Sequence, residues 1–223
     1  MFRHKRWIIH TRRHPCAILL LVQLAGMLLY PLFENTDSGR ILFGAFGVMV
    51  LIITTAMVRR TPGLAWVSAL IALPAIVLLA LQALFGMPEL LAWSSGLEAA
   101  FYFYAAGSLI AYMLADTRAS TDELFGAGAT FTLLAWAFAY TFMMLQQVAP
   151  GSFTAAVNAD APRSWNELLY LSFALLSSTG IGDVVPIRPA ARMICAVEMF
   201  VGVMYLAGVV ARLIGLTLVQ KRG

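Results

Sequence analysis

Charged residues are scarce in this chain of 223 residues: Asp, Glu, Lys and Arg together make up 12% of it, whereas hydrophobic residues make up 61%. Soluble domains contain about 25% charged and about 45 to 50% apolar residues, so a soluble globular protein is excluded. The net charge of +4 comes from short basic clusters between apolar stretches, and no polar domain presents them to a nucleic acid. We therefore expect an integral membrane protein whose surroundings are the lipid bilayer, with neither a nucleic acid nor a soluble protein as partner.

Cysteine and histidine are also rare. The two cysteines, Cys16 and Cys195, open the first apolar stretch and lie within the last, and we expect them at opposite membrane faces, where no disulfide forms. All three histidines lie in the N-terminal basic arm, and two of them on one helix face without a Cys or carboxylate partner make a poor metal site. We therefore expect neither a disulfide nor a metal centre.

Apolar stretches fill most of the chain. A hydrocarbon core of about 30 Å needs about 20 helical residues per crossing. This length predicts six transmembrane helices, at Cys16–Phe33, Ile41–Val58, Leu64–Phe85, Leu97–Leu114, Leu124–Leu145 and Ala190–Leu218. We divide the chain into a basic arm at residues 1–15, a four-helix membrane domain at residues 16–116 and a C-terminal domain at residues 117–223.

Basic residues are distributed unequally between the two sides of this six-helix arrangement. Of the fifteen, eleven fall on the side of the two termini, and four on the other: Arg40, Arg163, Arg188 and Arg192. Cytoplasmic loops carry the excess of Lys and Arg. The distribution therefore predicts a multi-pass protein of the cell (inner) membrane with both termini, including the basic arm, in the cytoplasm.

The segment between the fifth and sixth predicted helices is different. Trp165–Ser177 is moderately apolar, but a helix of this length extends only about 20 Å and is too short to cross. Ser178–Pro186, which follows, is expected to be non-helical, and such backbone survives at membrane depth only when it is buried in protein or lines a water-filled cavity. The pattern predicts a re-entrant helix and loop that enter from the outer face.

The loop carries a motif that reads Ser-Ser-Thr-Gly-Ile-Gly-Asp at residues 177–183. It resembles the selectivity filter of the pore-loop potassium channels, Thr-Thr-Val-Gly-Tyr-Gly-Asp, which it matches at Gly180, Gly182 and Asp183. The resemblance covers the C-terminal domain and is closest to small bacterial channels with six spans. It implies a homotetramer that conducts K⁺ passively, with K⁺ as permeant ion, no organic cofactor and no enzymatic activity. The ion-binding residues that it implies are Ser178, Thr179, Gly180, Ile181 and Gly182.

Physical reasons support the glycines of this motif. Successive carbonyls can face one axis only if alternate residues adopt backbone conformations that L-residues resist, and glycine at positions 180 and 182 permits this. One chain supplies only a quarter of each oxygen cage, which is why a tetramer is expected. A bare Gly-x-Gly also occurs in dinucleotide-binding motifs, but Val185 stands where the third glycine is needed and no strand precedes it.

Two positions depart from the family motif. Ile181 replaces an aromatic residue that braces the filter from behind in the family. Thr179 replaces valine, and its hydroxyl either compensates for that loss or bonds locally. A weakly selective monovalent cation channel is therefore an alternative, as is a non-conducting scaffold or a carrier. A carrier should show paired broken helices in two related halves, and the sequence contains a single broken segment.

Residues around the loop are candidates for supporting roles. Asp183 at the outer mouth would concentrate cations as a ring of four carboxylates, or would pair with Arg188 or Arg192. Gly202 matches the hinge of the family's pore-lining helix, or it allows close helix packing.

Glu198 lies within the last predicted span, where a charge is costly, so it should be neutral or partnered. Its candidate partners on the short helix are Tyr170, Ser172 and Ser177, and we expect a structural brace behind the filter. No basic residue occurs between Arg60 and Arg118, so the fourth span lacks the arginines of a conventional voltage sensor.

Overall fold

The computed structural model describes residues 15–33, 49–56, 65–115 and 121–220. Their helices are α2 (Pro15–Phe33), a helical stretch at residues 49–56, α4 (Ala65–Phe85), α5 (Leu91–Ala115), α6 (Thr121–Val148), α7 (Trp165–Leu176) and α8 (Pro189–Gln220), with the 3-10 turn η1 at Pro88–Leu90 before α5. Two strands, β1 (Phe153–Ala155) and β2 (Val184–Pro186), form a small antiparallel sheet. The chain is thus helical, as predicted from its composition.

The long helices lie where the apolar stretches predict them. Helices enclose or closely match the first, third, fifth and sixth predicted spans, and the second, Ile41–Val58, falls within the described residues only at 49–56. Within the described residues, three segments are long and apolar enough to cross a membrane: Leu91–Leu114, Asp122–Val148 and Pro189–Val209. Pro15–Tyr30 and Trp66–Gln82 are shorter apolar helices.

The start of α5 was predicted wrongly. Helix α5 begins at Leu91, before the predicted start at Leu97, because Ser94 in its first turn is buried and hydrogen-bonded. The Ser94 hydroxyl donates to the Leu91 carbonyl (3.2 Å) and accepts from the Gln82 amide at the end of α4 (2.7 Å). A search for apolar stretches does not detect a polar residue whose hydrogen bonds to a neighbouring helix allow it to be buried.

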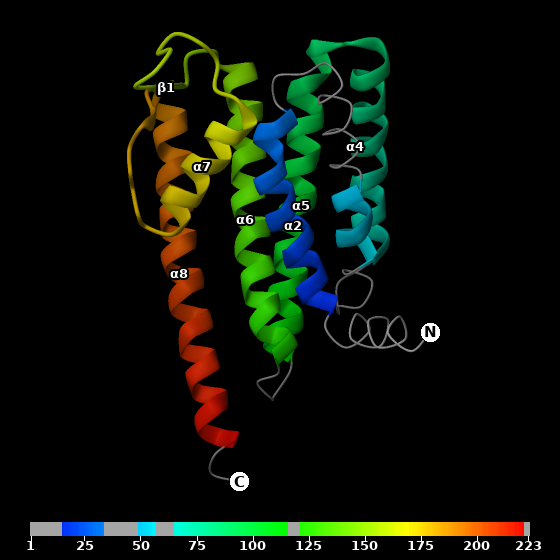
Figure 1. Cartoon of the computed structure of the whole chain (residues 1–223), viewed down its shortest axis with the longest axis vertical. Coiled ribbons are helices and arrows are strands. Elements are labelled where there is room, and N and C mark those ends of the chain that lie inside the picture. Colours follow the sequence, from blue (N-terminus) through cyan, green and yellow to red (C-terminus); the bar gives the residue numbers. More distant parts are fainter. Residues whose placement is uncertain (1–14, 34–48, 57–64, 116–120, 221–223) are drawn as a thin grey trace.

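Helices α2, α5, α6 and α8 run roughly side by side along the long axis of the molecule (Figure 1). At one end the Cys16 amide of α2 donates to the Asp122 carboxylate of α6 (3.2 Å), and the Arg212 guanidinium of α8 donates to the carbonyl of Met113 on α5. The starts of α2 and α6 therefore meet the final turns of α5 and α8, as in an up-and-down bundle. Both cysteines are buried free thiols.

The core lies between α5 and α6. Phe101, Tyr102 and Leu109 of α5 and Leu133 and Trp136 of α6 are almost completely buried. Aromatic rings continue this core to the opposite end of the bundle, where Trp165 at the start of α7 packs against Trp136 and Tyr30 with ring centroids 5.4 and 5.2 Å apart. The aromatic cluster thus positions the start of α7 against α6 and α2.

Candidate functional site

Helix α7 is a short helix set beside the first half of α8 (Figure 1). It begins with a capping box: the Ser164 amide donates to the Glu167 carboxylate (2.7 Å), and the Glu167 amide donates to the Ser164 hydroxyl (3.3 Å). These bonds satisfy amides that the first turn leaves unpaired. The helix then ends at Leu176, one residue before the predicted end, and twelve residues extend only about 18 Å.

The segment after α7 has an alternating backbone. Ser178, Gly180 and Gly182 have φ values of +59°, +60° and +79°, so every second residue lies in the left-handed region. Gly180 and Gly182 adopt it without a steric penalty, and Ser178 does so as a non-glycine residue at about 1 to 2 kcal/mol. The alternation expected at the two glycines is therefore present and extends to Ser178.

Three successive amides of this segment point back to α7. The Ser178 amide donates to the Leu175 carbonyl (3.0 Å), and those of Thr179 and Gly180 donate to the Ala174 carbonyl (2.9 and 3.1 Å). In a trans peptide the C=O lies opposite the N–H, and the described residues contain no cis peptide bond. The carbonyls of residues 177–179 therefore point away from α7, toward the exposed side of the segment.

Two side chains of the segment are tied together. The Ser177 hydroxyl donates to the Phe173 carbonyl (2.6 Å), and it lies 2.7 Å from the Thr179 hydroxyl. Thr179 thus bonds locally, and through Ser177 it is connected to α7. Ile181, where the family carries the bracing aromatic residue, is 61% exposed in the single chain.

The outgoing limb of the segment is held by the two strands. The Asp183 carbonyl accepts from the Ala156 amide (3.1 Å), and Val184 and Val185 of β2 pair with β1. The Asp183 carboxylate accepts from the Val184 amide (2.8 Å). Arg192, one of its two expected ionic partners, donates to the carbonyl of Pro186 (3.2 Å). Within the described part of the single chain, neither Arg188 nor Arg192 lies within ion-pair distance of Asp183, so the alternative pairing is not made there.

Glu198 of α8 is completely buried behind α7. The Ser172 hydroxyl lies 2.8 Å from the Ala135 carbonyl of α6 and is hydrogen-bonded to the Glu198 carboxyl group. Of the three partners expected for Glu198, the structure selects Ser172. Tyr170 is 40% exposed, and Ser177 bonds Phe173 and Thr179. The Ser172 side chain thus connects α6, α7 and α8 through two hydrogen bonds.

Gly202, four residues further along α8, touches the end of α7. A Cβ at this position would lie 2.2 Å from the Leu176 carbonyl oxygen, far inside van der Waals contact. Of the two readings of Gly202, a hinge or close packing, this approach supports close packing.

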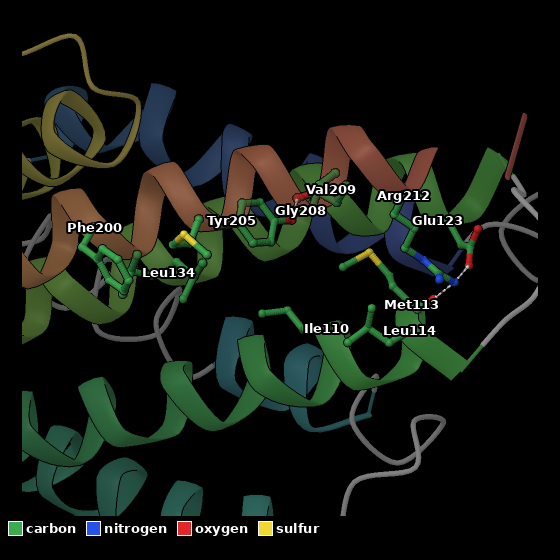
Figure 2. Close-up of a pocket in the computed structure, with 13 residues that line it drawn as sticks. Ile110, Met113, Leu114, Glu123, Leu134, Phe200, Tyr205, Gly208, Val209 and Arg212 are labelled. Carbon is green, nitrogen blue, oxygen red and sulfur yellow. Dashed lines mark hydrogen bonds and ion pairs between the residues drawn. The ribbon is translucent and has the colours of Figure 1, made fainter. Parts of the chain in front are cut away.

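The inner surface of α8 borders a pocket of about 390 Å³ between α5, α6 and α8 (Figure 2). Its lining is apolar except at one end, where Arg212 pairs with Glu123 of α6 (3.6 Å) and donates to the Met113 carbonyl. The sequence reasoning missed this contact. Arg212 lies within the sixth predicted span, where an arginine indicates a partner, but Glu123 lies in the polar stretch before the fifth predicted span.

Residues 128–218 match a family model described as "Ion channel". This part of the chain is similar to an ion-channel domain. The match includes most of α6, all of α7, the segment after it and most of α8, and it covers less than half of the chain. No curated protein and no solved structure matches the chain significantly. The C-terminal part of the protein is therefore similar to ion channels, while α2, α4 and α5 lie outside the matched residues.

Proposed function

We propose that the protein is a potassium channel in which residues 178–182 of four copies form the selectivity filter. The observation that carries this proposal is the alternating left-handed backbone at Ser178, Gly180 and Gly182, combined with amides directed at α7. This backbone turns consecutive carbonyls to the side away from α7, as a cage for a dehydrated cation requires. The channel acts passively and is not an enzyme.

The tetramer is supported by the exposure of α8. Only 17% of its membrane-spanning window is buried within the chain, against 67% for α6. Large apolar side chains such as Met193, Val197, Phe200 and Met204 are more than half exposed. In a fourfold assembly these side chains pack against neighbouring copies or line the pore.

The membrane arrangement that we propose has six spans, with α7 as the re-entrant pore helix and both termini in the cytoplasm of the cell. It is supported by the helix positions and by Arg212, which lies at the same end as the start of α2. The predicted excess of basic residues lies at that end, and cytoplasmic loops carry such an excess. The Asp183 carboxylates then ring the outer mouth, where they attract cations.

The alternative that a specific observation favours is a weakly selective monovalent cation channel. Ile181 is exposed and has no hydroxyl to donate into the α7 layer, so the support of the filter depends on the shorter link from Thr179 through Ser177 to Phe173. We favour potassium selectivity because the amides of residues 178–180 are anchored independently of that side chain.

Ion flux from liposomes tests the proposal. The purified protein is reconstituted with a K⁺ gradient, and efflux is compared with that of Gly180→Ala, in which a Cβ strains the left-handed backbone. We expect flux from the wild-type protein and loss of it in the variant. Absence of wild-type flux under any gradient, pH or membrane tension would leave a non-conducting scaffold or a carrier. Reversal potentials that give equal permeabilities for K⁺ and Na⁺ would identify the weakly selective channel.

A further inference from the structure

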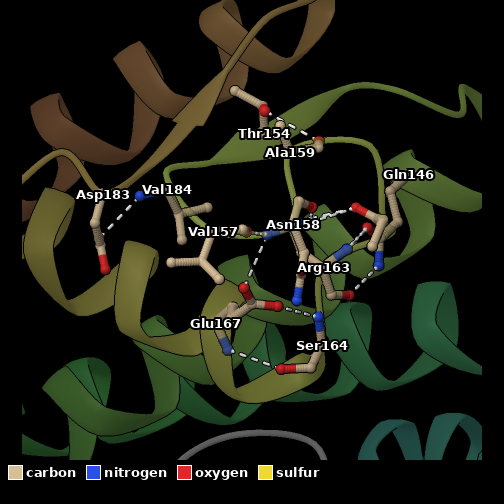
Figure 3. Close-up of polar contacts among 11 residues, drawn as sticks. Gln146, Thr154, Val157, Asn158, Ala159, Arg163, Ser164, Glu167, Asp183 and Val184 are labelled. Atoms are coloured by element: carbon tan, nitrogen blue, oxygen red, sulfur yellow. Dashed lines mark hydrogen bonds and ion pairs between the residues drawn. The ribbon is translucent and has the colours of Figure 1, made fainter.

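The loop between β1 and α7 is organised around one buried side chain, Arg163 (Figure 3). Its side chain is only 2% exposed. Nε donates to the Ala161 carbonyl (3.1 Å), Nη1 donates to the Val157 carbonyl (3.2 Å) and the Glu167 carboxylate (3.0 Å), and Nη2 donates to the carbonyls of Asn158 and Ala161. A guanidinium has five N–H donors, so every donor of Arg163 is used, four on carbonyls of the loop and one on Glu167 of α7.

The backbone of Arg163 is fastened to α6 as well. The Gln146 side-chain amide donates to the Arg163 carbonyl (2.8 Å), and its oxygen accepts from the Arg163 amide (3.0 Å). Gln146 lies in the last turns of α6 and is buried. Arg163 therefore joins three parts of the channel domain: the end of α6, the loop and, through Glu167, the first turn of α7.

The same loop holds the outer end of the proposed filter. The Thr154 hydroxyl of β1 donates to the Ala159 carbonyl (3.1 Å), which connects the strand to the loop that Arg163 binds. Strand β1 pairs with β2, and the Ala156 amide donates to the Asp183 carbonyl (3.1 Å). Asp183 directly follows Gly182, so the position of the last filter residue depends on the shape of this loop.

We propose that Arg163 is the positioning residue of the outer mouth: by holding the loop at residues 157–161 it fixes β1, and through β1 the exit of the filter. This inference rests on the proposed channel function. The planar guanidinium of Arg163 donates to four acceptors here. The ammonium group of lysine is a point charge with three donors and cannot replace it. The partner carboxylate of Glu167 balances the charge of Arg163, so the pair acts through geometry rather than through its field.

The ratio of K⁺ to Na⁺ permeability separates geometry from charge. A lost charge at the mouth changes the local concentration of both monovalent cations alike, whereas a displaced carbonyl changes their ratio. For both Arg163→Gln and Arg163→Lys in liposomes we expect this ratio to fall at least about tenfold, which corresponds to about 1.4 kcal/mol. Arg188→Gln, at an exposed arginine of the same outer side, should leave the ratio unchanged.

Hydrogen exchange of the reconstituted protein provides the second readout. In Arg163→Gln, peptides covering residues 153–157 and 183–187 should exchange faster than in Arg188→Gln. A folded Arg163→Gln channel with the wild-type ratio overturns the positioning role, even if exchange increases. Rescue of the ratio by Arg163→Lys overturns it too, because charge alone would then suffice. If the wild-type protein conducts no ions, the proposed function fails, and unchanged exchange in Arg163→Gln would independently refute the link between loop and strand.

Discussion

Gly202 of α8 lies directly against the backbone of Leu176, the last residue of α7. A Cβ at position 202 would stand 2.2 Å from the Leu176 carbonyl oxygen and 2.8 Å from its carbonyl carbon. Since the obstacle is backbone, no side-chain rotation relieves the clash. The end of α7, from which the proposed filter segment starts, is therefore supported by a contact that only glycine allows.

The first prediction concerns this contact. Gly202→Ala should destabilise the protein by about 1 to 3 kcal/mol or more, as overpacking does, and should displace the end of α7. Thermal unfolding in detergent measures the first effect and K⁺ flux the second. Gly208→Ala on the same helix is the matched control, because a Cβ there meets nothing within 4 Å. Equal unfolding temperatures for the two variants would show that the contact is not tight.

The second prediction concerns Glu198. The Ser172 hydroxyl has one proton but lies within hydrogen-bond distance of two acceptors, the Ala135 carbonyl and the Glu198 carboxyl group. Both contacts are made if Glu198 is neutral and donates to Ser172. Glu198→Gln keeps a donor of similar shape, so the stability of the assembly in detergent should remain near that of the wild-type protein.

Glu198→Ala removes the donor and leaves space beside Ser172, at about 1 to 3 kcal/mol for each buried polar group left unsatisfied. It should therefore unfold at a lower temperature than Glu198→Gln. Should glutamine prove as damaging as alanine, the neutral brace is refuted, and an ionised role for Glu198, such as a pair with Arg192 of a neighbouring copy, takes its place.

The third prediction concerns Ile181. Its side chain is 61% exposed in the single chain, so a larger aromatic side chain can replace it without disturbing the core of its own chain. Ile181→Tyr should raise the K⁺ to Na⁺ permeability ratio, because a phenol supplies the hydroxyl that isoleucine lacks. Reversal potentials under bi-ionic conditions measure the ratio, with Ile181→Leu as control. An unchanged ratio in Ile181→Tyr would mean that this side chain does not support the filter.

The fourth prediction concerns the ion pair at the far end of α8. The Glu123 side chain is only 3% exposed and lies 3.6 Å from the Arg212 guanidinium. Removing one partner of a buried pair costs about 3 to 5 kcal/mol, whereas replacing both costs much less. Arg212→Gln should therefore lower thermal stability more than the double variant Arg212→Gln/Glu123→Gln. Additive losses in this double-mutant cycle would show that the two side chains act independently.

Hydrophobicity and residue type predicted most of the fold. Long apolar stretches allow only helices in a bilayer, since each backbone amide must be paired locally, and the helices accordingly lie close to the predicted spans. The short helix at Trp165 was predicted as well, because its apolar residues and its length are local properties. The alternating backbone at Gly180 and Gly182 was predicted for the same reason: it depends on the absence of a Cβ at two positions.

Contacts between distant segments could not be read in this way. The choice of Ser172 over Tyr170 and Ser177 as the partner of Glu198 depends on the rotation of α7 against α8, which no local pattern specifies. The role of Arg163 was hidden, since in the sequence it is one of four basic residues on the outer side, and nothing marks it as buried.

The sequence by itself determined a membrane protein, its helices and a glycine motif suited to carbonyl ligands, because hydrophobicity, helix length and backbone freedom are properties of neighbouring residues. The tertiary structure alone decided that Gly202 supports α7 and that Arg212 pairs with Glu123. It also decided that β1 holds the exit of the motif through Asp183. These contacts join residues far apart in the chain, and they form only when the packing of α6, α7 and α8 brings their side chains and backbones within bonding distance.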